Sequence, residues 1–388
     1  MTLPEGVRAA QFRGANGCEE HFLSVDAPPI SGVPFAEQLA TVEARYAAAL
    51  EALGLDADSA VFRRVFVSDV LNQAYLVRES ALADNRATSP VAVSIVQQPP
   101  VGGGKAALLA YHVAGPEKMA KRRLTRNHIL FERADARHLW STRLCAGTEA
   151  APADSAAQTR MIFDGLTSVL AEQGATLEHD CQRTWIYLKD VDVFYHDMVT
   201  SRSTLFARHG LNAKTHYIAS TGIEGACAHQ FDVVSMDAYS NLDTKPEQVF
   251  YLNDFEHMCA TKDYNVTFER GTRLAYADRR HYYISGTASI DRVGKVVHRG
   301  DVLAQLDRAL ENVESILQSG EAGLEDMRYL IVYLRDRADY EAVEERLGAR
   351  LPGLPTVYVQ GPVCRPEWLI EVEGVGVTAN AQPELPCF

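Results

Sequence analysis

Hydrophobic and polar residues repeat the same order of patterns three times along this chain of 388 residues. Each repeat begins with an amphipathic stretch at helical spacing, over residues 35–53, 158–170 and 305–317. An apolar run of strand length follows each stretch, over residues 63–69, 183–190 and 328–336. The pattern therefore predicts a helix and then a strand in each third of the chain.

Three residue types mark the same positions in each repeat: a glutamine early in the helix, a glycine after it and an aspartate at the end of the strand. They are Gln38, Gly54 and Asp69, then Gln158, Gly174 and Asp190, then Gln305, Gly320 and Asp336. Successive members of each set lie 15 or 16 residues apart. Such regular spacing indicates an internal triplication, in which the glycine ends the helix.

A second helical stretch and two apolar strands complete each repeat. The strands are predicted at residues 91–96 and 106–113, 216–219 and 233–239, and 357–359 and 369–377. A hairpin is expected to open each repeat, and in the third it joins residues 280–289 to 295–298 through the turn 291–294. An antiparallel sheet with two helices on one face is an α+β design.

The repeats divide the chain into three units, residues 1–120, 121–243 and 244–388. Linkers are expected at residues 115–122 and 241–264. The second linker is long and carries Pro246, Asn253 and Asp254, so it is expected to be either a lid or a surface crossing.

The composition is that of a soluble globular protein, with 47% hydrophobic and 23% charged residues. The net charge of −13 argues against non-specific binding to nucleic acid or an anionic membrane. It leaves open a small anionic metabolite, because a cleft can carry a local field of opposite sign. The first residues do not resemble a signal peptide and no apolar run is long enough to cross a bilayer, so a cytoplasmic protein is expected.

The cysteines and histidines suggest no metal site. The seven cysteines are scattered and form no C-x-x-C pair: Cys18, Cys145, Cys181, Cys227, Cys259, Cys364 and Cys387. Neither a disulfide framework nor a zinc site is therefore expected, and a reducing compartment is favoured. The twelve histidines show no metal-ligand spacing, and no cofactor is predicted.

The last strand, residues 369–377, carries Glu371 and Glu373 on one face. Acidic residues are depleted in strands. The strand therefore either lies at a sheet edge with a solvated face, or directs Glu371 into a cleft where burial raises its pKa and makes it a proton donor. The matching positions in the other units are Ala107 and Ser235, which favours a special role for Glu371, with Glu373 as a structural neighbour that influences its pKa.

The triplicated helix, glycine stop, strand ending in aspartate and final Ile370-Glu371-Val372-Glu373 strand resemble the Rid family (YjgF-type reactive-intermediate deaminases). The resemblance covers nearly the whole chain. Rid proteins are homotrimers with ligand clefts between subunits, so it implies a pseudo-trimer within one monomeric chain, with sheets inside and helices outside. The family's substrate-binding arginine has no match, because its nearest counterparts are Ala92, Thr215 and Val357. This difference argues against ordinary imine deamination.

A narrower resemblance is carried by Cys364-Arg365 ahead of the Glu371 strand and by residues 284–290. Both are similar to the chorismatases, long Rid-fold enzymes that split chorismate into pyruvate and either a hydroxybenzoate or a dihydrodiol acid. The resemblance implies that Glu371 protonates the enol-ether methylene. It also places Cys364 at the cysteine of the hydroxybenzoate-forming members.

The substrate is expected to contact Ser285, Gly286, Thr287, Tyr217, Cys364 and Arg365. The backbone N–H groups of Gly286 and Thr287 face a carboxylate, or Gly286 only marks a bulge. Tyr217 lies across the cleft from the third unit or in a core, and Arg365 clamps a carboxylate or lies on the surface. Cys364 is expected to shape the pocket rather than act as a nucleophile, with Ala277 near the same pocket.

Three functions compete at this stage. The first is a cofactor-free chorismatase-like enzyme that uses Glu371 as the general acid. The second is a Rid-type deaminase, or another hydrolase of a reactive enamine or imine. The third is a non-catalytic scaffold that binds a metabolite or a partner.

Overall fold

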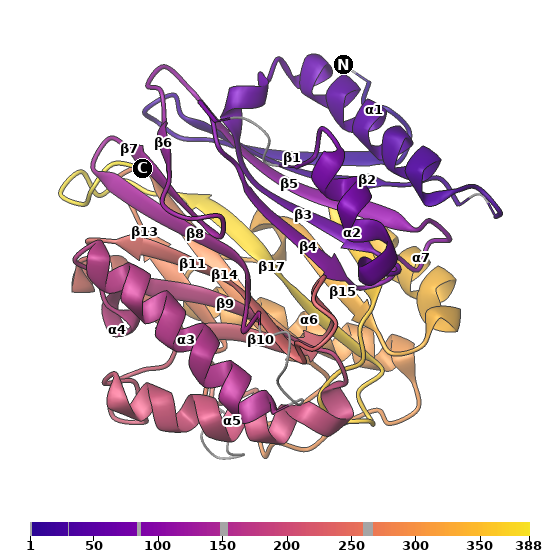
Figure 1. Cartoon of the computed structure of the whole chain (residues 1–388). Coiled ribbons are helices and arrows are strands. Elements are labelled where there is room, and N and C mark those ends of the chain that lie inside the picture. Colours follow the sequence, from indigo (N-terminus) through magenta and orange to yellow (C-terminus); the bar gives the residue numbers. More distant parts are fainter. Residues whose placement is uncertain (1, 30, 84–86, 148–153, 259–266) are drawn as a thin grey trace.

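The computed structural model describes residues 2–29, 31–83, 87–147, 154–258 and 267–388. Within these ranges the chain forms three mixed sheets, each built from one consecutive segment of the chain (Figure 1). No helix of the described part combines the length and the apolar character needed to cross a bilayer.

The first sheet has five strands in the spatial order β1-β2-β5-β3-β4. Helices α1 (Phe35–Leu53) and α2 (Val70–Glu79) accompany it. The strands are β1 (Val7–Arg13), β2 (Glu19–Asp26), β3 (Ala60–Val67), β4 (Ala92–Gln97) and β5 (Ala106–Ala114). Strands β3 and β4 are parallel, because α2 crosses between them, and the other neighbours are antiparallel.

The second sheet has six strands in the order β10-β9-β11-β8-β7-β6. Its helices are α3 (Ser155–Glu172), α4 (Leu177–Asp180) and α5 (Val191–Arg208). The strands are β6 (Ala120–Arg123), β7 (His128–Arg133), β8 (Ala136–Cys145), β9 (Cys181–Leu188), β10 (Ala219–Glu224) and β11 (Val234–Leu242). As in the first sheet, the pair joined through a helix, β9 and β10, is parallel.

The third sheet has the order β12-β13-β14-β17-β15-β16, with helices α6 (Val302–Ser319) and α7 (Tyr340–Arg350). The strands are β12 (Val249–Leu252), β13 (Gly271–Ala275), β14 (Arg279–Ala288), β15 (Met327–Leu334), β16 (Thr356–Gln360) and β17 (Ile370–Ala379). Strand β17, which carries Glu371, lies between β14 and β15. The alternative of a solvated edge strand is therefore wrong.

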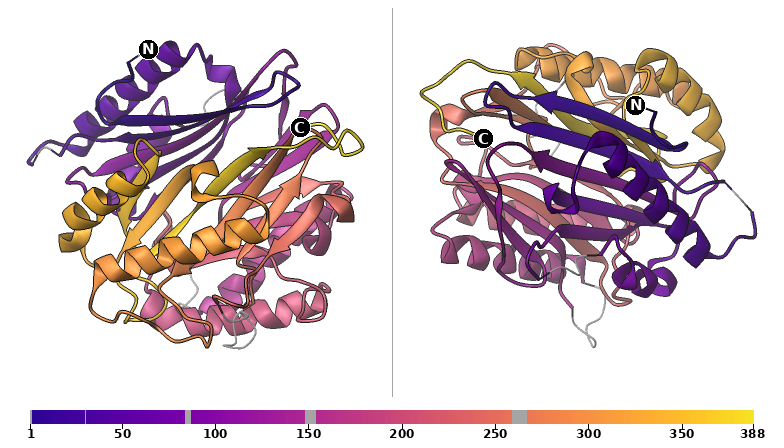
Figure 2. Two further views of the ribbon diagram at one scale, coloured as in Figure 1. Left: turned by 180° about the vertical axis from the view of Figure 1, so that it is seen from behind. Right: turned by 90° about the horizontal axis from the view of Figure 1, so that it is seen from above.

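The three sheets face one another in the interior and the long helices lie on the outside (Figures 1 and 2). The largest hydrophobic cluster takes members from all three sheets, including Phe66, Trp185 and Tyr333. The contacts between sheets form a ring: β4 lies against β8, β10 against β14, and β16 against β2. The predicted α+β pseudo-trimer is confirmed.

The strand registers relate the three units residue by residue. In the last strand of each unit (β5, β11 and β17), one residue pairs with the equivalent residue of the neighbouring strand. The pairs are Ala107–Phe66, Ser235–Tyr187 and Glu371–Tyr333. The equivalence of Ala107, Ser235 and Glu371 that the sequence suggested is therefore correct, and the first two units carry no carboxyl at this position.

The repeated polar residues hold local structure in place. Gln305 of α6 accepts a hydrogen bond from the N–H of Leu369 (2.9 Å) and donates one to the carbonyl of Glu367 (2.9 Å), which ties the helix to the start of β17. Gln38 and Gln158 make equivalent bonds to the starts of β5 and β11. Each repeated aspartate caps the helical turn that follows it.

The structure corrects three local predictions. The sheets are mixed rather than antiparallel. In the third unit β14 pairs with β13, whereas residues 295–298 form no strand and meet the residues after β14 through the isolated Ile290–Val296 bridge and hydrogen bonds between Val297 and Ser289. The strand predicted at 216–219 begins at Ala219, so Thr215 precedes it. The strand registers make Ser94 and Thr221 the counterparts of Val357, in place of Ala92 and Thr215.

The linker predicted at 241–264 is largely ordered. Strand β11 extends to Leu242, a helical turn covers Pro246–Gln248, and β12 joins the edge of the third sheet. Residues 259–264, including Cys259, lie outside the described residues. The choice between a lid and a surface crossing therefore stays a prediction.

Candidate active site

A cavity of about 880 Å³ opens between the second and third units, where β10 lies against β14. The second unit contributes Tyr195, His196, Val199, Thr200, Arg202, Ser203, Thr204, Ala213, Tyr217, Ser220, Thr221 and Gly222. The segment after it contributes Thr267, Phe268, Arg270, Gly286, Ala288, Ile290, Cys364, Arg365, Trp368 and Glu371. A cavity of this size suits a small metabolite.

Glu371 reaches this cavity from β17 with only 6% of its surface exposed. Burial raises the pKa of its carboxyl to about 8, and the neighbouring Glu373 adds to the rise, while Arg183 and Arg270 oppose it. Within the described residues no hydrogen bond reaches the Glu371 side chain. The group is therefore a protonated acid near neutral pH, able to donate its proton to a bound molecule.

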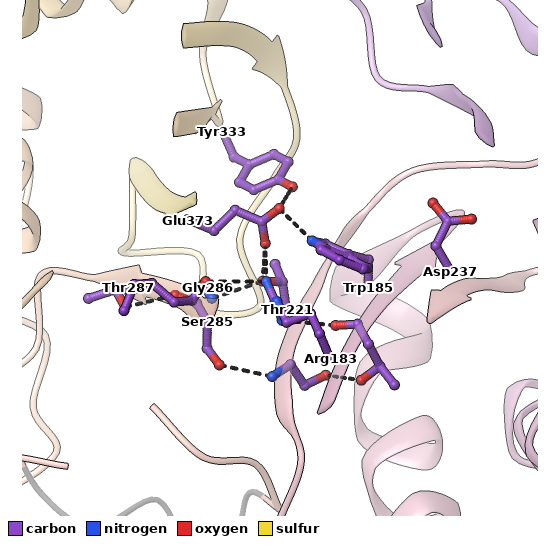
Figure 3. Close-up of polar contacts among 12 residues, drawn as sticks. Arg183, Trp185, Thr221, Asp237, Ser285, Gly286, Thr287, Tyr333 and Glu373 are labelled. Carbon is purple, nitrogen blue, oxygen red and sulfur yellow. Dashed lines mark hydrogen bonds and ion pairs between the residues drawn. The ribbon is translucent and has the colours of Figure 1, made fainter. Parts of the chain in front are cut away.

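Glu373 is buried on the same face of β17 but is surrounded by donors (Figure 3). Its carboxylate accepts hydrogen bonds from the guanidinium of Arg183 (2.5 Å), the indole N–H of Trp185 (2.8 Å) and the hydroxyl of Tyr333 (3.0 Å). The Thr221 hydroxyl donates a further bond. These four donors hold the Glu373 carboxylate in place, whereas no hydrogen bond in the described part of the chain reaches Glu371, so the two carboxyl groups have different surroundings. Glu373 is the structural and pKa-coupling neighbour that the sequence suggested.

Ser285 and Gly286 form a β-bulge opposite Glu373, since Ile284 pairs with Gly374 and Thr287 with Val372 (Figure 3). Gly286 lies on the cavity wall, and a Cβ atom there would collide with the Glu371 carboxyl. Both readings of Gly286, as a bulge residue and as a cavity residue, therefore apply. Its N–H donates to the Thr221 hydroxyl oxygen (2.8 Å), so this group supports the wall instead of facing a ligand as expected.

Ser285 and Thr287 are fully buried beside the bulge and do not line the cavity. The Ser285 hydroxyl donates to the Glu269 carbonyl (2.6 Å) and accepts the N–H of Ser220 (2.9 Å), which joins β14 to β10. The Thr287 hydroxyl donates to the Ser285 carbonyl (2.9 Å). The structure thus gives both residues supporting contacts at the junction, rather than the substrate contacts expected from the sequence.

Ala277 was expected near the pocket and is not. It lies in the turn between β13 and β14, where its N–H donates to the Pro386 carbonyl (2.9 Å). That turn is at the far end of β14 from Ala288, which pairs with Glu371. Arg279 and Ala288 are nine positions apart along the strand, a distance of about 30 Å.

Cys364 lines the cavity and is half-buried. Burial raises the pKa of its thiol to about 12, and the nearby Glu371 contributes to the rise. A protonated thiol is a poor nucleophile at neutral pH. The geometry therefore agrees with a pocket-shaping role for Cys364.

Three arginines bring positive charge to the cavity: Arg202, Arg270 and Arg365. Arg202 is 2% exposed and donates from Nε to the Thr267 hydroxyl oxygen (3.2 Å). Arg365 donates to the Gly294 carbonyl (2.9 Å), and its guanidinium lies 4.7 Å from the centre of the Trp368 ring. Guanidinium groups bind carboxylates in two-pronged geometry, so this wall suits an anion.

Sequence reasoning found Arg365 but missed Arg202 and Arg270. Arg202 belongs to α5 of the second unit and Arg270 precedes β13 of the third, and neither stands in a motif. Only the packing of the two units brings them to one wall. Tyr217 was expected across the cleft from the third unit, and it does line the cavity, with its N–H donating to Glu269 (2.8 Å).

Comparison with known proteins agrees with this architecture. The family profile described as "Endoribonuclease L-PSP" matches residues 272–378. A "3-aminoacrylate deaminase RutC" from Acinetobacter baylyi is 36% identical over 95 residues, which are 24% of this chain and 75% of that protein. A "Chorismatase" from Streptomyces rapamycinicus is 28% identical over 240 residues, 57% of this chain and 70% of that protein.

The crystal structure of a chorismatase at 1.08 Å resolution superposes with a TM-score of 0.62 at 18% identity. The match covers 96% of this chain and 100% of that one, so the fold of three units is shared over the whole length. The profile match falls on the unit that carries Glu371, the bulge and most of the charged wall. This chain belongs to the Rid (YjgF, endoribonuclease L-PSP) superfamily and lies near its chorismatase branch.

Proposed function

We propose that this protein cleaves the enolpyruvyl ether of chorismate, releasing pyruvate and a six-membered-ring carboxylic acid. The observation that carries the proposal is Glu371, a buried acid with a pKa of about 8, in a cavity that also holds three guanidinium groups. The similarity to the chorismatase of Streptomyces rapamycinicus supports the same substrate class.

The charges of the cavity suit this substrate. Chorismate carries two carboxylates, one on the ring and one on the enolpyruvyl side chain. Arg202, Arg270 and Arg365 offer planar donors for them, although the whole chain has a net charge of −13. The local field of a cleft decides binding at close range, because charges on the outer surface are screened by salt.

The acid step follows from the protonation state of Glu371. The proton moves from its carboxyl to the terminal methylene carbon, and the electron pair of the double bond forms the new C–H bond. The ether carbon becomes the centre of an oxocarbenium ion, and Glu371, which has lost its proton, is now a carboxylate beside it. General acid catalysis by a positioned carboxyl contributes about 10²–10⁴-fold to the rate.

Two routes then complete the cleavage. Water can add to the cationic carbon and give up a proton to Glu371, after which the hemiketal collapses to pyruvate and a dihydrodiol acid. Alternatively, the ring hydroxyl attacks the same carbon and gives its proton to Glu371, which forms a cyclic ketal. The original C–O bond to the ring then breaks, the ring carbon that bears the attacking oxygen loses its proton to the released oxygen, and the ring becomes aromatic. The remaining hemiketal collapses to pyruvate and a hydroxybenzoate. The protonated Cys364 thiol lies on the wall of the same cavity as Glu371, which makes it the candidate for influencing the choice between these routes.

Deamination of an enamine is the second candidate, and the 36% identity to RutC favours it. The strands β4, β10 and β16, however, carry no arginine at the position that resembles the family's substrate-binding site. The positive charge of this cavity comes from other elements, α5 and the segments before β13 and β17.

The test uses the full-length protein with chorismate and, separately, with 3-aminoacrylate. Pyruvate release from chorismate that is lost in Glu371→Gln supports the proposal. Ammonia release from 3-aminoacrylate, with no pyruvate from chorismate, supports the deaminase instead. Chorismate binding by calorimetry without any product formation supports the scaffold. Arg299→Gln, an exposed arginine in an ion pair with Glu367, is a matched control for Arg365→Gln, in which a higher KM is expected.

A further inference from the structure

The second unit carries a cluster of metal-ligating side chains at the position that corresponds to the acid site of the third. Ser235 pairs with Cys145 of β8, and its counterpart Glu371 pairs with Ala288 of β14. Cys145 therefore occupies the place of Ala288, but at the junction of the first and second units. The sites are distinct, because this junction is formed by β4 and β8 and the cavity by β10 and β14.

Three side chains converge at this junction. The sulfur atoms of Cys145 and Cys227 and a carboxylate oxygen of Asp232 all lie within 4.8 Å of one another. Cys145 is the last residue of β8, Cys227 follows β10, and Asp232 precedes β11. The chain therefore brings two thiols and a carboxylate together from the end of β8 and from the two ends of the connection between β10 and β11.

The carboxylate of Asp232 is built into this cluster. Asp232 is 2% exposed, and its Oδ2 accepts the N–H of Gly147 (3.0 Å) and lies 3.1 Å from Nδ1 of His229. Its Oδ1 is buried and has no hydrogen-bond partner within the described part of the chain. A buried carboxylate oxygen is costly to leave unpaired. A cation at the centre of the cluster would satisfy it.

We propose that Cys145, Cys227, Asp232 and His229 bind a zinc ion at the junction of the first and second units. Two thiolates, an imidazole and a carboxylate form the N/O/S donor set that zinc accepts with four ligands, whereas magnesium and calcium prefer oxygen alone. Zinc–sulfur bonds of about 2.3 Å and zinc–oxygen bonds of about 2.0–2.2 Å place neighbouring ligand atoms about 3.3–3.8 Å apart. The ligand atoms of Cys145, Cys227 and Asp232 lie within 4.8 Å of one another and need only a small contraction to reach this geometry. His229 lies outside this set of three, and its Nδ1 would join from its position 3.1 Å from Oδ2 of Asp232.

The donor set is anionic once a metal ion has displaced the protons of the two thiols. Two thiolates and one carboxylate carry three negative charges, which a divalent ion reduces to one.

The role of this ion is structural. Ser235 replaces Glu371 here, so the site has no acid at the equivalent position. The loop that carries Cys227 pairs with the first unit, since the N–H of Gln97 in β4 donates to the Ala226 carbonyl (2.8 Å). A metal bound to Cys227 and Asp232 fixes both ends of this loop and with them the contact between the two units.

The test measures metal content and ligand identity, and it does not depend on the chorismate reaction. Full-length protein purified without chelators is analysed for zinc by mass spectrometry. We expect about one zinc per chain in the wild type and in Cys387→Ser, a half-buried cysteine outside the cluster, and none in Cys145→Ser or Cys227→Ser. Asp232→Asn is expected to keep the fold and to bind zinc more weakly.

A second measurement remains decisive if the cysteine variants fold poorly. Cobalt added to metal-free wild-type protein is expected to give the absorption of thiolate-to-cobalt charge transfer and of tetrahedral cobalt, and zinc is expected to displace it. A chelator is expected to lower the Tm of the wild type. Zinc that persists in both cysteine variants overturns the proposal. So does protein that takes up neither metal, including protein in which a Cys145–Cys227 disulfide survives purification with a reductant.

Discussion

Glu371 and Glu373 lie two residues apart on the same face of β17, and the structure gives them different hydrogen-bonding surroundings. Glu373 is ion-paired with Arg183 and accepts further bonds from Trp185 and Tyr333, so its charge is compensated. In the described part of the chain no hydrogen bond reaches the Glu371 carboxyl, and the neighbouring Glu373 raises its pKa. One strand therefore carries both the acid, whose pKa is raised mainly by burial, and a neighbouring carboxyl that adds to the rise.

Glu371→Gln is expected to keep the fold and to lose about 10²–10⁴-fold in kcat, because the amide removes only the transferable proton. Circular dichroism and pyruvate release from chorismate measure the two effects. Glu367→Gln, four residues earlier in an exposed ion pair with Arg299, is the matched control and should keep its activity. Activity of Glu371→Gln within about threefold of wild type would place the acid elsewhere.

The rate is expected to fall as the pH rises through the pKa of Glu371. The acid form is required, and burial raises its pKa from 4.5 to about 8, so kcat/KM should decrease about tenfold per pH unit above about pH 8. A pH profile of initial rates measures this limb. A profile that stays flat up to pH 10 would show that the Glu371 proton is not used.

The free energy of unfolding is also expected to depend on the protonation of Glu371. Between pH 4.5 and about 8 the folded protein keeps a proton on Glu371 that the unfolded chain has lost. The contribution of this group is therefore fully present below pH 4.5 and is lost as the pH rises to 8, by about 1.4 kcal/mol per unit. Urea unfolding of wild type and Glu371→Gln at several pH values measures it. Equal slopes in both proteins would contradict the raised pKa.

Gly286→Ala is expected to inactivate the protein and to destabilise it by about 1–3 kcal/mol, because the added Cβ meets the Glu371 carboxyl and the Thr221 methyl group. Gly348→Ala is the matched control. It lies in α7 with nothing within 4 Å of its added Cβ, and should be neutral or slightly stabilising. Thermal unfolding and pyruvate release compare the two. Full activity of Gly286→Ala would show that the bulge tolerates a side chain and that Glu371 does not depend on it.

The product is expected to be mainly a hydroxybenzoate. Cys364 is small, weakly polar and protonated at neutral pH, so it is a poor site for an ordered water and favours attack by the ring hydroxyl. Ala277, which was expected near the same pocket, lies at the far end of β14 and therefore does not affect this expectation. Chromatography of the products decides it. A dihydrodiol acid from the wild type, unchanged in Cys364→Ala, would assign the hydrolytic route and leave Cys364 as packing.

Local features were the most predictable part of the fold. Helix α1 has the bounds 35–53 that its pattern predicted, because an amphipathic stretch and the left-handed Gly54 define both its face and its end. The third unit differs slightly: the left-handed residue is Glu321, and Gly320 instead makes room for Leu252. Strand β10 was misplaced because its sequence Ala-Ser-Thr-Gly-Ile-Glu is mostly small and polar, as suits a strand packed against another unit.

The sequence by itself determined the triplication, the α+β class and the position of Glu371, because these follow from periodicity and from equivalent positions along one chain. Only the tertiary structure decided which charges surround that acid. Arg202 and Arg270 reach the cavity, and Cys145, Cys227 and Asp232 meet at another junction, through contacts between segments far apart in the chain. Burial and proximity of this kind depend on how whole units pack, and no local pattern of residues records them.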